Sequence, residues 1–329
     1  MNAFEYASPA TKEQAVSLLS DRWGETEILA GGTDLLSLMK DQLSSPKRVV
    51  NIKDLKEFQG IHYTAGKGLR LGSLATLEEL MENPTVKKEY PALWEAADGV
   101  RSPQIRNFGT VGGDLCQRPR CWYFRSGLGY FPKDENGKEI IPRGENQYHA
   151  ILGNQGPAYF INPSSLAPAL IALEARLRLF GPQGWREVAV EEFFTSPSKE
   201  GEREYVLKPN EILGEILVPA ADSVQNATYE VREKEALDWP LAAAAVALRM
   251  QGQKVTKARL VLGHVAPVPW LAKEAGSLLE GKTINENLAA EAASTALSSA
   301  RPLTKNSYKV QLAKVALKRA ILKAVQGGA

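Results

Sequence analysis

Two paired-glycine segments contain the residues with which this chain could do chemistry. The first consists of Leu29, Ala30, Gly31, Gly32, Thr33, Asp34 and Leu35, and the second of Thr110, Val111, Gly112, Gly113 and Asp114. Glycine adopts left-handed backbone angles and lets a ligand approach closely, so that consecutive N–H groups can converge on an anion. Because the segments match each other and neither fits G-x-G-x-x-G, we expect them to hold the two phosphates of one dinucleotide without a Rossmann fingerprint.

A basic and aromatic stretch, residues 116–125, follows the second segment. Its cysteines, Cys116 and Cys121, are the only two in the chain and are too few for a disulfide framework or for a metal cluster of their own. They fit either free thiols or part of an electron-transfer surface, and we favour free thiols. The arginines of this stretch could contact a flavin pyrophosphate or a partner subunit, and both interpretations stay open.

A dense run of charges, residues 232–238, precedes Trp239 and Pro240. Such runs are typical of solvated loops. Beside a redox ring, however, a charged loop can tune the potential or gate access, and Asp238 is the candidate for that role.

One segment matches a phosphate-binding motif by its letters alone. Residues 276–283 fit the Walker A pattern G-x-x-x-x-G-K-[ST]. A phosphate loop must follow a strand and open a helix, whereas residues 270–280 already have a helical pattern of apolar side chains. We therefore interpret Gly281 as the glycine that ends a helix.

Short elements must position the first glycine segment. Residues 27–30 are typical of a strand that leads into it, and residues 34–42 of a helix that begins there, with Thr33 or Asp34 as its cap. With a helix over 12–20, capped by Thr11, and a strand over 48–52, they form a compact βαβ-like unit.

The rest of the chain alternates between strand and helix patterns around one long insertion. We expect strands at 60–63, 69–72, 158–161, 175–180, 185–194, 212–219, 241–249 and 257–264. We expect helices at 76–82, 90–99, 166–173, 271–279, 286–298 and 309–325. Residues 126–147 are expected to form a long surface loop and residues 221–225 a linker.

The composition excludes several classes of protein. The chain has 329 residues and a formal net charge of +2, which suits two or three globular domains and disfavours nucleic-acid binding. Its longest apolar run, residues 241–248, is far too short to span a membrane, and the N-terminus has no export signal. The scattered histidines predict no metal site. We expect a cytoplasmic protein, unless a partner's signal exports the complex.

The two glycine segments, residues 212–219 and Asp238-Trp239-Pro240 occur in the order found in one family. The chain resembles the FAD-binding subunit of xanthine-dehydrogenase-type molybdenum hydroxylases and is similar to the medium subunit of carbon monoxide dehydrogenase. The resemblance covers nearly the whole chain, including a C-terminal domain entered at residues 258–267.

The resemblance implies an α/β (α+β) fold. A vanillyl-alcohol-oxidase-type FAD-binding domain would occupy residues 1–222, with subdomains at about 1–56 and 57–222 and an insertion at about 117–152. A C-terminal α/β domain with a small antiparallel sheet and helices would occupy residues 223–329.

The resemblance also assigns cofactor-binding residues. The two glycine segments would bind the FAD pyrophosphate, Val100 would lie near the adenine, and the neighbourhood of Leu213 would pack on the flavin. The family often has an aspartate that reaches the cofactor where this chain has Ser165, so a hydroxyl stands in place of that carboxylate.

The insertion resembles that of bacterial aldehyde oxidoreductases, whose flavin subunit carries a four-cysteine [4Fe-4S] cluster there. This chain keeps residues 120–125 and 146–150 at the ends of the insertion. Two cysteines cannot supply the four thiolates of such a cluster, so we expect no iron-sulfur cluster in this chain.

The implied function is that of an electron-transfer flavoprotein within a heterotrimer. Electrons would arrive from [2Fe-2S] clusters of a small partner and leave through FAD to NAD, dioxygen or another acceptor. The substrate would react on a large subunit that holds the molybdenum cofactor, so this chain needs no general base or nucleophile. Two alternatives stay open: a self-sufficient flavin oxidoreductase of the same fold, and a structural subunit whose flavin site has decayed.

Overall fold

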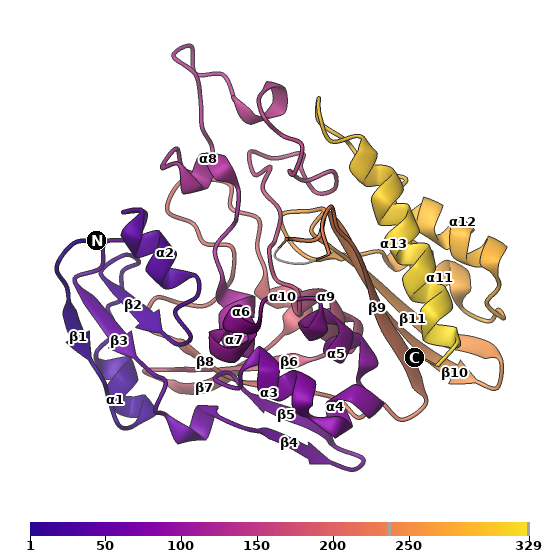
Figure 1. Cartoon of the computed structure of the whole chain (residues 1–329), viewed down its shortest axis with the longest axis horizontal. Helices are drawn as coiled ribbons and strands as arrows, with labels where there is room; N and C mark the ends of the chain where they lie inside the picture. The colour runs from indigo at the N-terminus through magenta and orange to yellow at the C-terminus, as the bar shows by residue number, and fades with distance from the viewer. Residues whose placement is uncertain (236–237, 328–329) are drawn as a thin grey trace.

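Three sheets organise the chain in the computed structural model, which describes residues 1–235 and 238–327 (Figure 1). Ala236 and Leu237, which belong to the charged run before Trp239, lie outside the described residues. The architecture is mixed α/β, as expected, and helices cover the sheets. No helix within the described ranges is both long and apolar enough to cross a membrane.

The N-terminal sheet is parallel and delivers the first glycine segment. It has the order β1-β3-β2, and its elements are β1 (Glu5–Ala7), β2 (Thr26–Leu29), β3 (Arg48–Asn51), α1 (Lys12–Ser17) and α2 (Leu35–Lys40). The Thr11 hydroxyl accepts a hydrogen bond from the Gln14 N–H, so the predicted cap of α1 is confirmed. Of the two residues predicted to cap α2, Asp34 occupies the N-cap position, but its side chain makes no capping bond.

The central sheet is antiparallel, with strand order β4-β5-β8-β6-β7. Its strands are β4 (Ile61–Thr64), β5 (Gly68–Gly72), β6 (Arg176–Gly181), β7 (Gly184–Ala189) and β8 (Ile212–Val218). The helices around it are α3 (Leu77–Glu82), α4 (Pro84–Glu89), α5 (Pro91–Asp98), α6 (Pro103–Phe108), α7 (Val111–Cys116), α9 (Ala167–Ala172) and α10 (Val190–Phe193). Thr76 and Glu79 form a reciprocal capping box that starts α3 where the sequence predicts a helix.

Two predicted strands are wrong in whole or in part. Residues 190–193 form helix α10 where the second half of a strand was expected. Residues 158–161 form no strand, because the backbone here bonds to irregular segments. The Ala150 N–H donates to the Tyr159 carbonyl, and the N–H of Asn162, the next residue, donates to the Ala266 carbonyl. An apolar run can thus be buried without joining a sheet.

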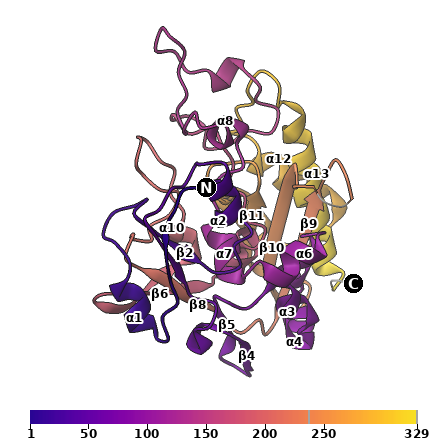
Figure 2. The same cartoon turned by 60° about the vertical axis from the view of Figure 1, so that its left-hand side comes forward.

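The predicted insertion stands away from the sheets between α7 and α9, as Figures 1 and 2 show. Among its residues the structure has only two short helical turns, α8 (Trp122–Arg125) and η2 (Ile141–Arg143). A small cluster of Tyr130, Ala158 and Phe160 gives this region a core of its own.

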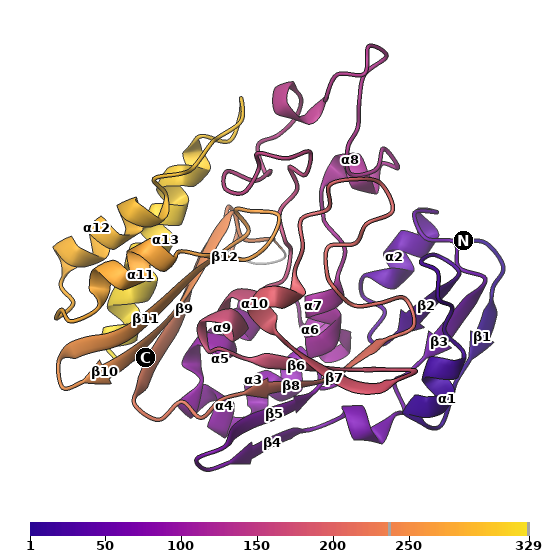
Figure 3. The ribbon, with the colours of Figure 1, turned by 180° about the vertical axis from the view of Figure 1, so that it is seen from behind.

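The C-terminal region is an antiparallel sheet covered by three helices (Figure 3). Its elements are β9 (Val224–Val231), β10 (Ala242–Gln251), β11 (Lys254–Gly263), β12 (Trp270–Leu271), α11 (Lys273–Leu279), α12 (Glu286–Ala296) and α13 (Tyr308–Val325). Alternate residues of β10 face two cores: Ala244 and Val246 pack under the helices, whereas Ala245 and Ala247 pack toward the central sheet. This double burial explains the apolar run of residues 241–248.

Strand β9 begins inside the predicted linker, at Val224, and residues 221–223 before it form no strand. Its sequence is polar, but α5 supplies its partners: the Asn226 side-chain oxygen accepts a bond from the Ala92 N–H at 2.9 Å, and the Thr228 N–H donates to Glu95 at 2.6 Å. The interpretation of the Walker-like segment is confirmed, because Gly276 lies inside α11 and Gly281, with φ +77°, follows its end.

Candidate flavin site

The first glycine segment lies against Phe108 and Gly109, the residues that lead into the second. A Cβ atom on Gly31 would lie 1.8 Å from the backbone oxygen of Phe108, so only glycine permits this approach. Gly32 has a left-handed φ of +76°. In contrast, Gly112 and Gly113 belong to the first turn of α7, so the second segment is the start of a helix.

The two glycines at the start of α7 have different surroundings. The Thr110 hydroxyl accepts a bond from the Gly113 N–H at 3.0 Å and caps the helix. A Cβ on Gly112 would lie 2.7 Å from Cβ of Ser73, so Gly112 serves packing. A Cβ on Gly113 would lie 2.9 Å from the Thr110 hydroxyl oxygen and would meet nothing else within 4 Å. Gly113 therefore leaves an open face.

Two cavities meet at these segments. The loop cavity, of about 160 Å³, lies between the first glycine segment and β8, and the Val100 cavity, of about 310 Å³, extends from α7 to Trp239. Their shared lining includes Thr33, Asp34, Thr110, Gly113 and Gln117.

The structure gathers the predicted site residues around these two cavities. Besides the shared residues, Ala30, Gly31, Gly32, Leu35, Gly112 and Leu213 line the loop cavity, and Val100, Asp114, Ser165 and Asp238 line the Val100 cavity. Leu29 lies behind Gly32, where its side chain would be 3.1 Å from a Cβ on that glycine. The lining also includes Trp23, Arg203 and Tyr205, which carry no local sequence signal for a site.

The Asp34 carboxylate points to the insertion. It accepts a bond from the Arg118 backbone N–H at 2.8 Å, and its Oδ1 lies 2.8 Å from Nη2 of Arg125 and 3.0 Å from Nη1 of Arg120. Two of the arginines left open in the sequence therefore neutralise the first glycine segment. A bound pyrophosphate would meet a loop whose one carboxylate is already paired.

The Asp114 carboxylate is hydrogen-bonded to the residues that lead into α9. The Ser164 hydroxyl and the backbone N–H groups of Ser165 and Leu166 donate to its buried carboxylate, the last two at 3.2 and 3.0 Å. Burial raises the pKa of Asp114, and these bonds act against that rise. Asp114 thus fixes the segment that brings Ser165 to the wall of the Val100 cavity.

Both cysteines are free thiols, as predicted. Burial raises the pKa of Cys116 to about 12, and Sγ of Cys121 lies 3.2 Å from Nε2 of His149. Within residues 1–235 and 238–327, no three His, Cys, Asp or Glu side chains are grouped as metal ligands would be.

Comparison with known families decides what this site serves. Residues 2–221 match the family described as "FAD binding domain in molybdopterin dehydrogenase", and residues 227–324 match "CO dehydrogenase flavoprotein C-terminal domain". This chain belongs to the FAD-binding subunits of the molybdenum hydroxylases. The flavoprotein is thus a component of an oxidoreductase, and the resemblance inferred from its glycine segments is confirmed.

Individual relatives match the flavoprotein over nearly its whole length. It is 30% identical over 323 residues to the carbon monoxide dehydrogenase medium chain of Hydrogenophaga pseudoflava, covering 97% of this chain and 96% of that one. It is 29% identical to the aldehyde oxidoreductase FAD-binding subunit PaoB of Escherichia coli K12, covering 95% and 96%.

Solved structures confirm the fold of the flavoprotein. The carbon monoxide dehydrogenase structure from H. pseudoflava matches with a TM-score of 0.77 at 28% identity, covering 100% of this chain and 99% of that one. Quinoline 2-oxidoreductase from Pseudomonas putida 86 matches with a TM-score of 0.76 at 26% identity, covering 99% and 98%.

The residues of the flavoprotein fit FAD. The first glycine segment turns through the left-handed Gly32, and Gly113 presents an open face beside the cavities. Together the cavities reach the size of a site for a large organic ligand, which is roughly 300–1,000 Å³.

Proposed function

We propose that the chain is the electron-transfer subunit of a molybdenum hydroxylase heterotrimer. It would accept electrons from [2Fe-2S] clusters of a small partner and pass them to NAD, dioxygen or another acceptor, while the substrate reacts at the molybdenum cofactor of a large partner. The names of relatives as a medium chain and as a FAD-binding subunit support this role. The observation that carries it is the close approach of Gly31 to Phe108, just before the second glycine segment, together with the cavity lining that the two segments share.

Bound FAD would supply the redox chemistry, and the chain would bind and orient it. Backbone N–H groups of residues 29–35 would surround the pyrophosphate. Residues 110–114, whose N–H groups from Val111 to Asp114 are bonded within the protein, would contact it through Thr110 and the open face of Gly113. Val100 would contact the adenine and Leu213 the flavin. Ser165 and Asp238 would offer polar contacts from the wall of the Val100 cavity, where both lie.

This assignment gives the chain no acid, base or nucleophile of its own. The charges around the cavities include pairs such as Asp34 with Arg125, and burial raises the pKa of the thiol in the lining of the loop cavity, Cys116, to about 12. The division into a FAD-binding domain, residues 1–222, and a C-terminal domain, residues 223–329, is part of the proposal, as is a cytoplasmic location. The net charge of +2 supports protein partners rather than nucleic acid or a membrane surface.

An absorption spectrum of the purified chain tests the proposal. Bound FAD absorbs at about 450 nm, and we expect Gly113→Val to lose that band because the added side chain fills the open face beside Thr110. Gly156→Val is the matched control, since a Cβ there meets nothing within 4 Å. Circular dichroism confirms that both variants are folded.

The outcomes separate the candidates. A folded Gly113→Val protein that keeps its full FAD content contradicts the assigned site. Substrate turnover by the chain alone favours a self-sufficient flavin oxidoreductase. A colourless wild-type protein that takes up no added FAD indicates a structural subunit with a decayed site.

A further inference from the structure

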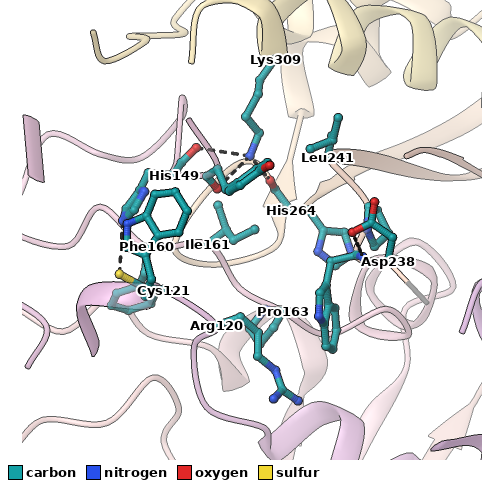
Figure 4. A pocket seen from close by; sticks show the side chains of 14 residues that line it. Arg120, Cys121, His149, Phe160, Ile161, Pro163, Asp238, Leu241, His264 and Lys309 are labelled. Carbon is teal, nitrogen blue, oxygen red and sulfur yellow. Dashed lines mark hydrogen bonds between the residues drawn. The ribbon is translucent and has the colours of Figure 1, made fainter. Parts of the chain in front are cut away.

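A third cavity, which we call the histidine cavity, lies between the insertion and the C-terminal region (Figure 4). Its volume is about 220 Å³, and its lining is mostly aromatic and apolar. Arg120, Asp238, Trp239 and Pro240 line both this cavity and the Val100 cavity, so the two are neighbours. Nothing in the proposed FAD site uses the side chains on its far walls.

One wall holds a buried imidazole whose hydrogen-bonding capacity is unused. His264 directly follows β11 and is 2% exposed, and neither ring nitrogen has a hydrogen-bond partner among the described residues. Its backbone is left-handed, with φ +60°, and its carbonyl accepts a bond from Nζ of Lys309 at 2.8 Å. A left-handed backbone at a non-glycine residue and buried nitrogens without partners both lower the stability of the fold. Such features are found most often at functional sites.

A second buried histidine, His149, lies on the opposite wall. Figure 4 places Cys121 and His149 across the cavity from Asp238. His149 is 3% exposed, and Nδ1 of its ring is buried without a partner among the described residues. Burial lowers the pKa of His149 to about 4 and that of His264 to about 3, so both rings are neutral near pH 7. Each neutral ring has one N–H donor and one nitrogen acceptor.

Most hydrogen-bonding atoms of the charged groups at the cavity are already bonded. Lys309 Nζ donates to the carbonyls of Tyr148, His149 and His264, and burial lowers its pKa to about 7. Nη1 of Arg120 pairs with Asp34 at 3.0 Å, whereas its Nε has no partner among the described residues. The Asp238 carboxylate accepts from the backbone N–H groups of Trp239 and Lys234. A cation would meet Lys309 and Arg120 here, and an anion would approach Arg120 but also meet Asp238, so burying either ion would be unfavourable.

We propose that the histidine cavity binds an uncharged, planar aromatic molecule with a hydrogen-bond donor and acceptor at its edge, such as an aromatic carboxamide. Trp122, Phe160 and Trp239 offer aromatic surfaces to its ring, and His264 and His149 bind its polar edge. An apolar cavity of about 150 Å³ admits benzene, so the volume here suits a small ring system. The site is separate from the FAD site and goes beyond the proposed electron transfer.

Benzamide and benzoate are matched probes, because they share a shape and differ in charge. We expect the purified full-length chain to bind benzamide saturably, observed by ligand NMR and tryptophan fluorescence, and benzoate at least about tenfold more weakly. His264→Phe keeps a ring but removes both nitrogens, and we expect the Kd of benzamide to rise about tenfold. His62→Phe, at an exposed histidine in β4, should leave it unchanged.

A second variant covers the case in which His264→Phe does not fold. Ile161 lines the cavity, so the larger side chain of Ile161→Trp should fill it and abolish benzamide binding. Equal affinity for both probes, unchanged binding in either folded variant, or no saturable binding, as expected of a cavity that holds only water, overturns the proposal. The FAD band of the same samples tests the electron-transfer role separately, because a yellow protein without benzamide binding contradicts only this inference.

Discussion

Oδ1 of Asp34 lies 2.8 Å from Nη2 of Arg125, and both side chains are mostly buried. This ion pair joins the first glycine segment to an insertion that is distant in sequence. Arg118 and Arg120 add a backbone bond and a second ion pair to the same carboxylate. The insertion therefore shapes the glycine segment, although its sequence lacks the cysteines of a metal cluster.

Replacing Asp34 by asparagine should destabilise the protein. The amide keeps the shape but removes the charge that faces Arg125 and Arg120, which we expect to lower the free energy of unfolding by about 2 kcal/mol. Urea denaturation measures this change. Asp21→Asn is the control, because Asp21 is exposed. Equal stability of the two variants would mean that the ion pair contributes nothing.

Alanine at Gly31 should disrupt the FAD site. The new Cβ would lie 1.8 Å from the Phe108 carbonyl oxygen, so one glycine segment must move away from the other. We expect the FAD content of the purified protein, measured by absorbance after gel filtration, to fall at least about tenfold. Gly156→Ala, where a Cβ meets nothing within 4 Å, should retain its FAD. Retention of FAD by Gly31→Ala would show that the contact between the segments is dispensable.

Asp114 and Ser165 should differ in their effects on stability. The Asp114 carboxylate accepts bonds from Ser164, Ser165 and Leu166, and the amide of Asp114→Asn has only one oxygen to accept them. We expect the free energy of unfolding, measured by thermal or urea denaturation, to fall by about 2–3 kcal/mol. Ser165→Ala removes only a hydroxyl from the wall of the Val100 cavity and should leave stability nearly unchanged. The reverse order would contradict the structural role of Asp114.

Acidification should destabilise the protein through its buried histidines. Burial lowers the pKa of His264 from 6.5 to about 3 in the folded state, so the unfolded state binds the proton more tightly. The stability is fully present above pH 6.5 and is lost as pH falls toward 3. Each such histidine contributes a slope of about 1.4 kcal/mol per pH unit in that window.

Urea denaturation at pH 7, 6 and 5 measures this slope. His264→Asn should flatten it, because asparagine tolerates the left-handed backbone and does not titrate there. His62→Asn, at an exposed histidine, should keep the wild-type slope. A slope that is the same in all three proteins would show that His264 does not titrate on unfolding.

The local pattern of the sequence determined the elements that depend on near neighbours. Thr11 and Thr76 begin their helices as predicted, and Gly281 ends α11, because caps and turns are decided within a few residues. The glycine segments were recognisable for the same reason. Their composition and order indicated the family and its cofactor before any contact between them was known.

Only the tertiary structure decided how distant groups meet. The polar strand β9 forms because α5 supplies partners for Asn226 and Thr228. Asp34 occupies the N-cap position of α2, but its carboxylate pairs with arginines of the insertion instead of capping the helix. The burial of His264, which leaves both of its ring nitrogens unpaired, likewise depends on segments far away in the chain. Local periodicity carries no information about such pairings, because their energy comes from contacts that exist only after the chain has closed its long loops.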